Sequence, residues 1–199
     1  GHFTLKDIAS GEIIIISDAD AVTGTFTVPL PSNRQYVIEV KYEGYAMTSL
    51  GFDLTYNENQ TTYHLDIPMN PLNSNTENVL QNIYFDLSSS NLRKESNVEL
   101  NNLANFLRSK PSIKIELGGH TDTRGKAEDN QKLSADRAKA VYNYLIQVEH
   151  IDASRLTFIG YGETNPIISD QEIAKLATEV EREKAHQTNR RTVYKIIAQ

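Results

Sequence analysis

Residues 115–125 read IELGGHTDTRG and join a predicted strand to a glycine-rich loop. The apolar residues of the first part alternate with polar ones, which is typical of a strand with one buried face. Three glycines surround the Thr121-Asp122 pair, and glycine allows tight turns and a close approach of the backbone to a ligand. We therefore predict that the loop 118–125 brings backbone amides close to a bound molecule.

Predicted helices lie on both sides of this loop. Ser96 and Glu99 have the spacing of a capping box, in which each residue bonds the backbone of the other, and leucines follow at helical spacing. A second apolar stripe predicts a helix over about 134–148. Ser169 and Glu172 repeat the capping-box spacing. The third apolar stripe consists of Ile173, Leu176, Ala177 and Val180.

Four predicted strands alternate with these helices. They cover residues 79–86, 113–117, 156–161 and 192–197. The order β-α-β-α-β-α-β predicts an α/β (α+β) sandwich, in which helices pack on a sheet.

The segment 67–76, IPMNPLNSNT, separates this part from an earlier one, because its prolines and asparagines interrupt any hydrophobic period. Short strands and turns precede it and predict a small all-β sandwich. These strands cover residues 12–17, 24–30, 36–40, 52–56 and 61–67. We predict domains over 1–70 and 79–199, joined by a linker at 71–78.

The composition limits the possible functions. Of the 199 residues, 39% are hydrophobic and 23% charged, which fits a soluble globular protein. No apolar run approaches the roughly 18 residues of a membrane-spanning helix. No signal peptide opens the sequence, and we expect an export signal or lipid anchor to lie upstream. The absence of cysteine excludes disulfides and thiolate metal sites.

The charge is distributed unevenly along the chain. The part before position 73 holds three basic and nine acidic side chains, and it therefore accounts for the whole net charge of −6. The remainder is neutral overall. Neither part has the basic excess that a nucleic-acid-binding domain needs, so we expect no nucleic-acid partner.

Asp122 and Arg137 are the candidate ligand-binding pair. The aspartate lies in the glycine-rich loop, and the arginine follows near the start of the predicted second helix. A carboxylate can take an ammonium group, and a planar guanidinium can hold a carboxylate through two parallel hydrogen bonds. Together they could hold one small zwitterion.

Five motifs resemble, in order and spacing, the OmpA-like C-terminal domain, which is also found in Pal lipoproteins and flagellar-stator proteins. They read IYFDLSSSNLRKES (83–96), IELGGHTDTRG (115–125), NQKLSADRAKAVYNYL (130–145), RLTFIGYGETNPI (155–167) and NRRTVYKI (189–196). The resemblance implies a mixed sheet and non-covalent binding of peptidoglycan, without catalysis or a cofactor. It also implies a periplasmic location, with the protein anchored at the outer membrane.

The resemblance assigns roles to individual residues. The family ligand is the diaminopimelate of the stem peptide, whose side chain ends in both an ammonium and a carboxylate. The family aspartate falls on Asp122 and the family arginine on Arg137. The supporting positions are Phe85, Asp86, Thr121, Asn130, Leu133, Asn189, Arg190 and Arg191.

Two stretches depart from the family pattern. Residues 185–188, AHQT, stand where the family commonly has a Gly-Arg pair, and residues 170–184 are longer and more charged than the common form. Both stretches adjoin the expected binding face. We interpret the charged run 179–184 as a solvated helix face, and expect Arg190 and Arg191 to pair with carboxylates near the site.

The predicted domain 1–70 resembles, through GTFTVPLPSNRQYVIEVKYEGY (24–45), the carboxypeptidase regulatory-like (transthyretin-like) modules of bacterial envelope proteins. Such modules are usually non-catalytic, and here the first strand of the module is expected to be missing. In Bacteroidota-type proteins this pair of domains also occurs in a type IX secretion component. A docking role for the acidic module in an envelope complex is therefore an alternative to a simple cell-wall anchor.

Two other kinds of site have less support. His120 and Asp122 could ligate a metal, but the five histidines have no ligand spacing, and a role in positioning the loop is favoured. Asp86 and Asp122 could form the carboxylate pair of a cell-wall hydrolase. No nucleophile elbow or Ser-His-Asp arrangement supports catalysis.

Overall fold

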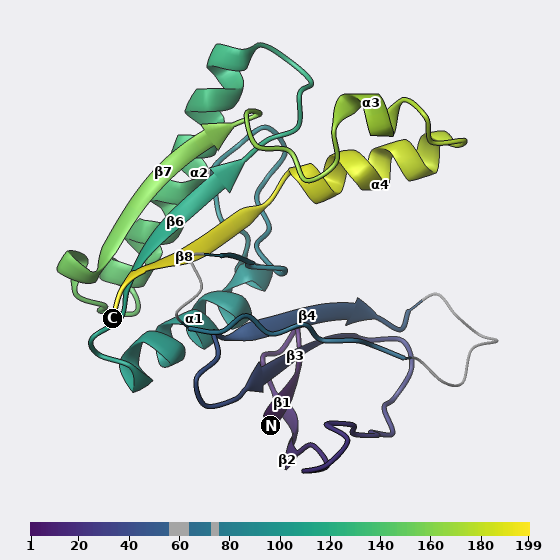
Figure 1. Cartoon of the computed structure of the whole chain (residues 1–199), viewed down its shortest axis with the longest axis vertical. Helices are drawn as coiled ribbons and strands as arrows, with labels where there is room; N and C mark the ends of the chain where they lie inside the picture. Colours follow the sequence, from purple (N-terminus) through teal and green to yellow (C-terminus); the bar gives the residue numbers. More distant parts are fainter. Residues whose placement is uncertain (56–63, 73–75) are drawn as a thin grey trace.

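The structure is a computed structural model that describes residues 1–55, 64–72 and 76–199 (Figure 1). It contains two four-stranded sheets. The first is antiparallel, with the order β2-β1-β3-β4. Its strands are β1 (His2–Asp7), β2 (Ile13–Asp18), β3 (Gln35–Lys41) and β4 (Thr48–Asp53). The first part is therefore all-β, as predicted.

One strand predicted in this part is absent, another is absent over its described residues, and one strand was not predicted. Residues 24–30 alternate as a strand would, yet they form none, and their apolar side chains cover the sheet instead. Phe26, for example, stacks on Phe3 with the ring centroids 4.3 Å apart. The strand predicted at 61–67 is also absent over residues 64–67, and residues 61–63 lie outside the described ones. The unpredicted strand is β1, which lies inside the sheet between β2 and β3.

The second sheet is mixed, with the order β5-β8-β6-β7, in which only β6 and β7 are parallel. Its strands are β5 (Glu77–Val79), β6 (Lys114–His120), β7 (Leu156–Gly162) and β8 (Thr192–Ala198). The helices of this part are α1 (Asn97–Ser109), α2 (Ala127–Gln147), α3 (Asp170–Ile173) and α4 (Glu179–Asn189). Short 3-10 turns cover Lys94–Ser96 and Ala153–Arg155. The predicted α+β class is confirmed. No helix within the described ranges is long and apolar enough to span a membrane.

The strand predicted over 79–86 is wrong beyond Val79. β5 ends there, and Phe85 makes only an isolated bridge to Leu92. Ser96 explains the change, because its hydroxyl accepts a hydrogen bond from the Tyr84 amide at 2.8 Å and donates one to the Tyr84 carbonyl at 3.0 Å. The capping box predicted at Ser96 is therefore also wrong. This hydroxyl caps no helix and instead holds the irregular segment that leads to it.

The third predicted helix is two helices. The capping box at Ser169 is confirmed, but α3 ends at Ile173. A second capping box, between Thr178 and Glu181, then opens α4. The predicted apolar stripe is broken by this restart, and Val180 is 79% exposed.

Gly118 and Gly119 lie in β6 rather than in a loop that cradles a ligand, which corrects that prediction. A Cβ on Gly119 would lie 2.2 Å from the backbone oxygen of Ser134 in α2, so this glycine lets the helix pack closely on the sheet. The true loop starts at Thr121. It contains Gly125, whose φ of 107° favours glycine.

Replacing Gly119 with alanine should lower the free energy of unfolding by about 3 kcal/mol, because backbone atoms must move. Gly118→Ala is the matched control. Its Cβ would meet side-chain atoms of Val193 and Tyr161 rather than backbone atoms, so we expect a smaller loss of about 1 kcal/mol. Urea unfolding followed by circular dichroism would measure both. Equal losses would contradict the assigned role of Gly119.

The two parts are packed against each other, with α1 between the sheets (Figure 1). Ala46 and Met47 belong to the same buried apolar cluster as the leucines of α1. The Tyr194 hydroxyl of β8 donates a hydrogen bond to the Met47 carbonyl at 2.7 Å. The predicted domain boundaries stay a prediction, but the contact between the two parts is a buried one.

Candidate functional site

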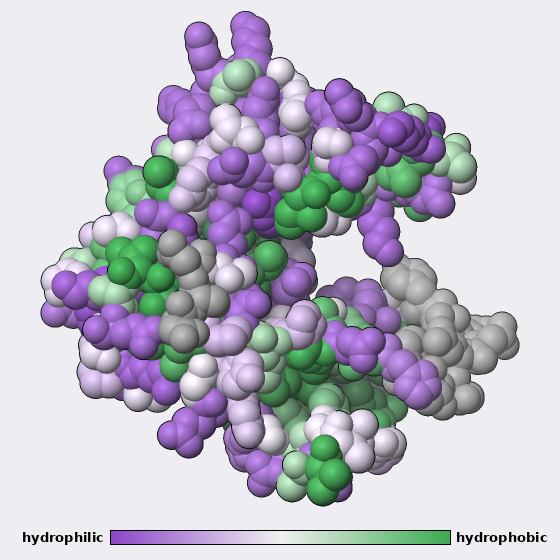
Figure 2. Space-filling model, in the orientation of Figure 1, coloured by the Kyte–Doolittle hydropathy of each residue, from purple (hydrophilic) through white to green (hydrophobic). Residues whose placement is uncertain are grey.

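A pocket of about 490 Å³ lies in the second part, where the segment 83–88, the loop after β6, α2 and the C-terminal end of α4 meet. In the space-filling view, the surface is hollowed between α4 and the first sheet (Figure 2). Eight of the ten predicted site residues line the pocket. They are Phe85, Asp86, Thr121, Asp122, Asn130, Leu133, Arg137 and Arg190.

Asp122 is buried at the start of the loop. Its Oδ2 accepts hydrogen bonds from Arg124 Nε at 2.9 Å and Nη2 at 2.7 Å, and another from Arg190 Nη1. Burial opposes ionisation of the carboxyl, but the hydrogen bonds from these two arginines outweigh it and hold the pKa of Asp122 below its usual value. Asp122 is therefore an anion near neutral pH.

Asn130 fixes the loop that carries this aspartate. Its side-chain amide donates to the carbonyls of Asp122 and Arg124, each at 3.2 Å, and to the Glu163 carboxylate at 2.7 Å. The amide thus ties the loop to the first turn of α2. The Thr121 hydroxyl beside it is buried and has no hydrogen-bond partner among the described residues.

Arg137 reaches the pocket from the third turn of α2, which begins earlier than predicted. Its Nε donates to the Ser89 carbonyl at 3.0 Å, and its guanidinium carbon lies 5.0 Å from the Phe85 ring centroid. Burial and the nearby Arg190 lower the pKa of Arg137, while Asp122 raises it. The bond from Nε therefore orients the guanidinium. Neither Nη group bonds any residue within 1–55, 64–72 or 76–199, so within these ranges both are available to a ligand.

The sequence did not single out Arg124 and Glu183. The Glu183 carboxylate bridges Arg124 Nη1 at 2.8 Å and Arg190 Nη2 at 2.7 Å, and these hydrogen bonds lower the pKa of Glu183 to about 2. Glu183 is exposed, as predicted for the run 179–184, but it also lines the pocket, which the prediction did not include. The spacing of Glu183 and Arg190, two helical turns, was an available signal, because it places both on one helix face.

Asn189 and Arg191 do not line the pocket. Asn189 is buried, and its side chain bonds the backbone of Ile167 and Ile168. Arg191 pairs with Glu77 at 3.1 Å, next to the second sheet. Both Arg190 and Arg191 do pair with carboxylates, although only Arg190 does so in the pocket. A direct ligand contact by Asn189 or Arg191 stays a prediction.

His120 is buried behind the site and stacks on Tyr161, with the ring centroids 4.8 Å apart. Burial and the Arg191 charge lower the pKa of His120 to about 4, although Glu77 opposes them, so the ring is neutral near pH 7. No group of three metal-ligating side chains occurs in the part of the chain that the structure describes. This environment fits the favoured interpretation of His120 as a residue that positions the loop.

The charges of the pocket favour an anionic ligand that also carries an ammonium. Four arginines line it, at positions 93, 124, 137 and 190, against three carboxylates, at positions 86, 122 and 183. One positive charge is therefore left over. A ligand with one ammonium and two carboxylates would neutralise it and still provide a partner for Asp122.

Residues 84–179 match the sequence model of the OmpA family. The match, just under half of the chain, contains Asp122 and Arg137 but ends where α4 begins. This part of the chain is therefore OmpA-like. Glu183 and Arg190 complete the pocket from outside the matched segment.

Two curated relatives share this segment. Outer membrane porin F of Pseudomonas aeruginosa is 36% identical over 85 residues, which are 43% of this chain and 24% of that protein. The peptidoglycan-associated lipoprotein of Rhizobium meliloti is 35% identical over 92 residues, or 46% of this chain and 52% of that protein. The chain thus spans about half or less of these relatives. A solved structure, the cell wall anchor of the T6SS from Pseudomonas aeruginosa, is 27% identical, with a TM-score of 0.46, and the alignment covers 58% of this chain and 75% of that one.

Proposed function

We propose that this chain binds peptidoglycan without covalent attachment, by holding the diaminopimelate of a stem peptide in the pocket of Asp122 and Arg137. One observation carries the proposal. A buried carboxylate lines the same pocket as a guanidinium whose two Nη groups bond none of the residues that the structure describes. The ammonium of diaminopimelate would bond Asp122, and its side-chain carboxylate would take the two Nη groups of Arg137.

The comparisons support peptidoglycan as the ligand. The matched relatives are named as an outer membrane porin and a peptidoglycan-associated lipoprotein. We infer that the chain works in the periplasm and anchors an outer-membrane-associated protein or complex to the cell wall. The direct test is an NMR titration with a diaminopimelate-containing stem peptide and with its lysine-containing analogue. Lysine lacks the second carboxylate, so equal affinities would contradict the role of Arg137.

A scaffold role in an envelope secretion complex, type IX-like, is the alternative function. The acidic first part would provide the docking surface, and the pocket would still bind the cell wall. Co-purification of the same envelope proteins with the chain and with an Arg137→Ala variant would favour the scaffold. Loss of those proteins with the variant would favour the anchor alone.

A cell-wall hydrolase is a third function, in which Asp86 and Asp122 would be the two carboxylates. The environment of Asp122 argues against it as the general acid, because hydrogen bonds from two arginines keep this carboxylate ionised. Release of soluble muropeptides from sacculi would support the hydrolase. Stable co-sedimentation without release would exclude it.

Glu183 should weaken ligand binding, because it occupies two guanidiniums that a carboxylate of the ligand could take. Replacing it with glutamine keeps the shape of the side chain and removes the charge. We expect the Glu183→Gln variant to bind the stem peptide about two- to fivefold more tightly, the scale of an exposed ion pair. Isothermal titration calorimetry would measure the change.

Glu179→Gln is the matched control for this effect. Glu179 lies on the same helix and pairs with Arg182, outside the pocket. Its replacement should leave the affinity unchanged. Weaker binding by Glu183→Gln alone would mean that Glu183 contacts the ligand directly.

A further inference from the structure

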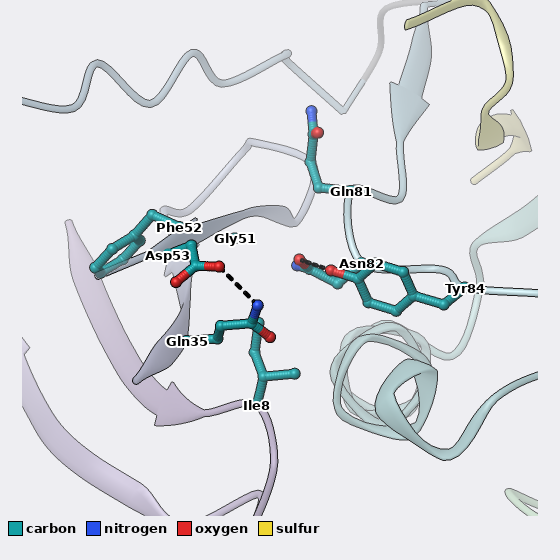
Figure 3. Close-up of a pocket in the computed structure, with 8 residues that line it drawn as sticks. All are labelled: Ile8, Gln35, Gly51, Phe52, Asp53, Gln81, Asn82 and Tyr84. Carbon is teal, nitrogen blue, oxygen red and sulfur yellow. Dashed lines mark hydrogen bonds between the residues drawn. The ribbon is translucent and has the colours of Figure 1, made fainter. Parts of the chain in front are cut away.

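A second pocket, of about 280 Å³, lies at the junction of the two parts of the chain. The first part contributes residues of β3, β4 and the turn after β1, and the second contributes the segment 81–84 (Figure 3). The pocket exists only because the two parts pack together. Its volume is just below the usual range for small-molecule sites, about 300–1,000 Å³.

Tyr84 connects this junction pocket to the pocket of Asp122, since it lines both. Its backbone is held at two points by Ser96, so the segment between the pockets is fixed. Tyr84 is 37% exposed. A ligand that fills the pocket of Asp122 can therefore extend across Tyr84 into the junction pocket.

The polar groups of the junction pocket form two pairs that face each other (Figure 3). On one side, Gln35 Nε2 donates to Asp53 Oδ2 at 2.8 Å. On the other, the Tyr84 hydroxyl donates to Asn82 Oδ1 at 3.4 Å. Amide, carboxylate and phenol groups offer both donors and acceptors at short range. Such a mixture suits hydroxyl and acetamido groups, which also donate and accept.

The charge of the junction pocket differs from that of its neighbour. Asp53 is the only side chain charged near neutral pH among its eight lining residues, and no cation lines it. A carboxylate or phosphate ligand would meet no partner there. Ile8 is buried and the Phe52 ring packs on Tyr36, so the Tyr84 ring is the exposed surface against which the C–H face of a sugar ring can lie.

We propose that the junction pocket binds a sugar of the peptidoglycan glycan strand, while the stem peptide on that strand fills the pocket of Asp122. This inference rests on the proposed function. An extended peptide reaches about 3.3–3.6 Å per residue, so a few residues suffice to join two pockets that share a side chain. The pocket is neutral to acidic and rich in amides, whereas its neighbour has an excess of arginine. The two thus match the uncharged glycan and the charged peptide of one ligand.

The test compares three probes by calorimetry and NMR: a stem tripeptide containing diaminopimelate, the same tripeptide bearing its disaccharide, and a tetrasaccharide of N-acetylglucosamine. We expect the disaccharide to strengthen tripeptide binding about tenfold, or about 1.4 kcal/mol. Gln35→Ala and Asp53→Asn should remove that gain and leave the affinity for the tripeptide unchanged. Gln147→Ala, an exposed glutamine at the end of α2, is the matched control and should change nothing.

The outcomes separate this inference from the proposed function. If the tripeptide binds, but the disaccharide adds no affinity and the tetrasaccharide does not shift the Gln35 and Asn82 amide signals, the sugar site is wrong and the stem-peptide site stands. If the tripeptide fails to bind, but the tetrasaccharide shifts those signals, the proposed function is wrong and the sugar site stands. Failure of all three probes would overturn both.

Discussion

An Arg137→Ala variant will not co-sediment with purified sacculi, and neither will an Asp122→Ala variant. Each change removes one of the two charged partners of a ligand held in a partly buried pocket. Truncating one partner of such a hydrogen-bonded charge pair costs about 2–5 kcal/mol, which corresponds to a loss of affinity of roughly 30-fold or more. Sedimentation of each variant with sacculi, quantified against the parent chain, measures the loss.

The two variants need different controls. Among the described residues, Arg137 bonds only the Ser89 carbonyl and stacks on Phe85, so its removal should leave the fold intact. Arg137→Lys retains a charge without the planar fork and should bind weakly. Removal of the Asp122 side chain leaves Arg124 and Arg190 without this carboxylate, and Asp122→Asn, which keeps the shape, is therefore the better test.

Lys139→Ala completes the set. This exposed lysine lies on the same helix as Arg137, and its loss should not affect sedimentation. Sedimentation of folded Arg137→Ala and Asp122→Asn at the level of the parent would refute the site. Sedimentation lost in all variants, Lys139→Ala included, would point to nonspecific charge attraction instead.

Asp122 and Arg137 could be paired from the sequence because their chemistry is local. Asp122 and Arg137 lie close in the sequence, on a loop and the helix that follows it, and one strand-loop-helix unit is enough to bring them together. Arg124 lies on the same loop and could have been identified in the same way. Glu183 was not, because its contact with Arg124 depends on where α4 lies relative to that loop, and α4 itself was not predicted as a separate helix.

Glycines were misinterpreted for a related reason. Gly118 and Gly119 stand next to the aspartate in sequence, which suggested a ligand loop. Their role is to let α2 and neighbouring side chains approach the sheet, and that contact is visible only once the helix is placed.

The contact between the two parts could not be predicted from the sequence either. Nothing in the sequence before β4 indicates that Ala46 and Met47 would pack in one cluster with the leucines of α1.

A substitution in the contact between the two parts should also have a large effect on stability. Glu99 of α1 is fully buried, and its carboxylate accepts hydrogen bonds from Ser49 in β4 and, at 3.1 Å, from the Asn82 side chain. Lys6 of β1 lies nearby and bonds Asn102, one turn along the same helix. Glu99→Ala should therefore lower the free energy of unfolding by about 3–5 kcal/mol, because it leaves buried polar partners unsatisfied and opens a cavity. Urea unfolding would measure the loss.

The pH dependence gives the sharper test of this network. Burial raises the pKa of Glu99 above its ordinary value of 4.5, against the lowering effect of Ser49 and Asn82. In this pH range the folded state holds the proton more tightly than the unfolded state, so stability falls as pH rises from about 4.5 through the folded-state pKa. Glu99→Gln carries no titrating group and should not show this part of the fall. It should therefore gain stability relative to the parent as pH increases.

Glu128→Gln, an exposed site on α2, is the control and should follow the parent at every pH. If Glu99→Gln also follows the parent, Glu99 is ionised in the folded state over the whole range and its charge is balanced by Lys6. That result would make the contact between the two parts an ion pair, and Lys6→Met should then destabilise the chain as strongly as Glu99→Ala. If Lys6→Met is instead tolerated, the contact does not depend on the charge of Lys6, and the junction pocket beside Asn82 keeps its shape without the lysine.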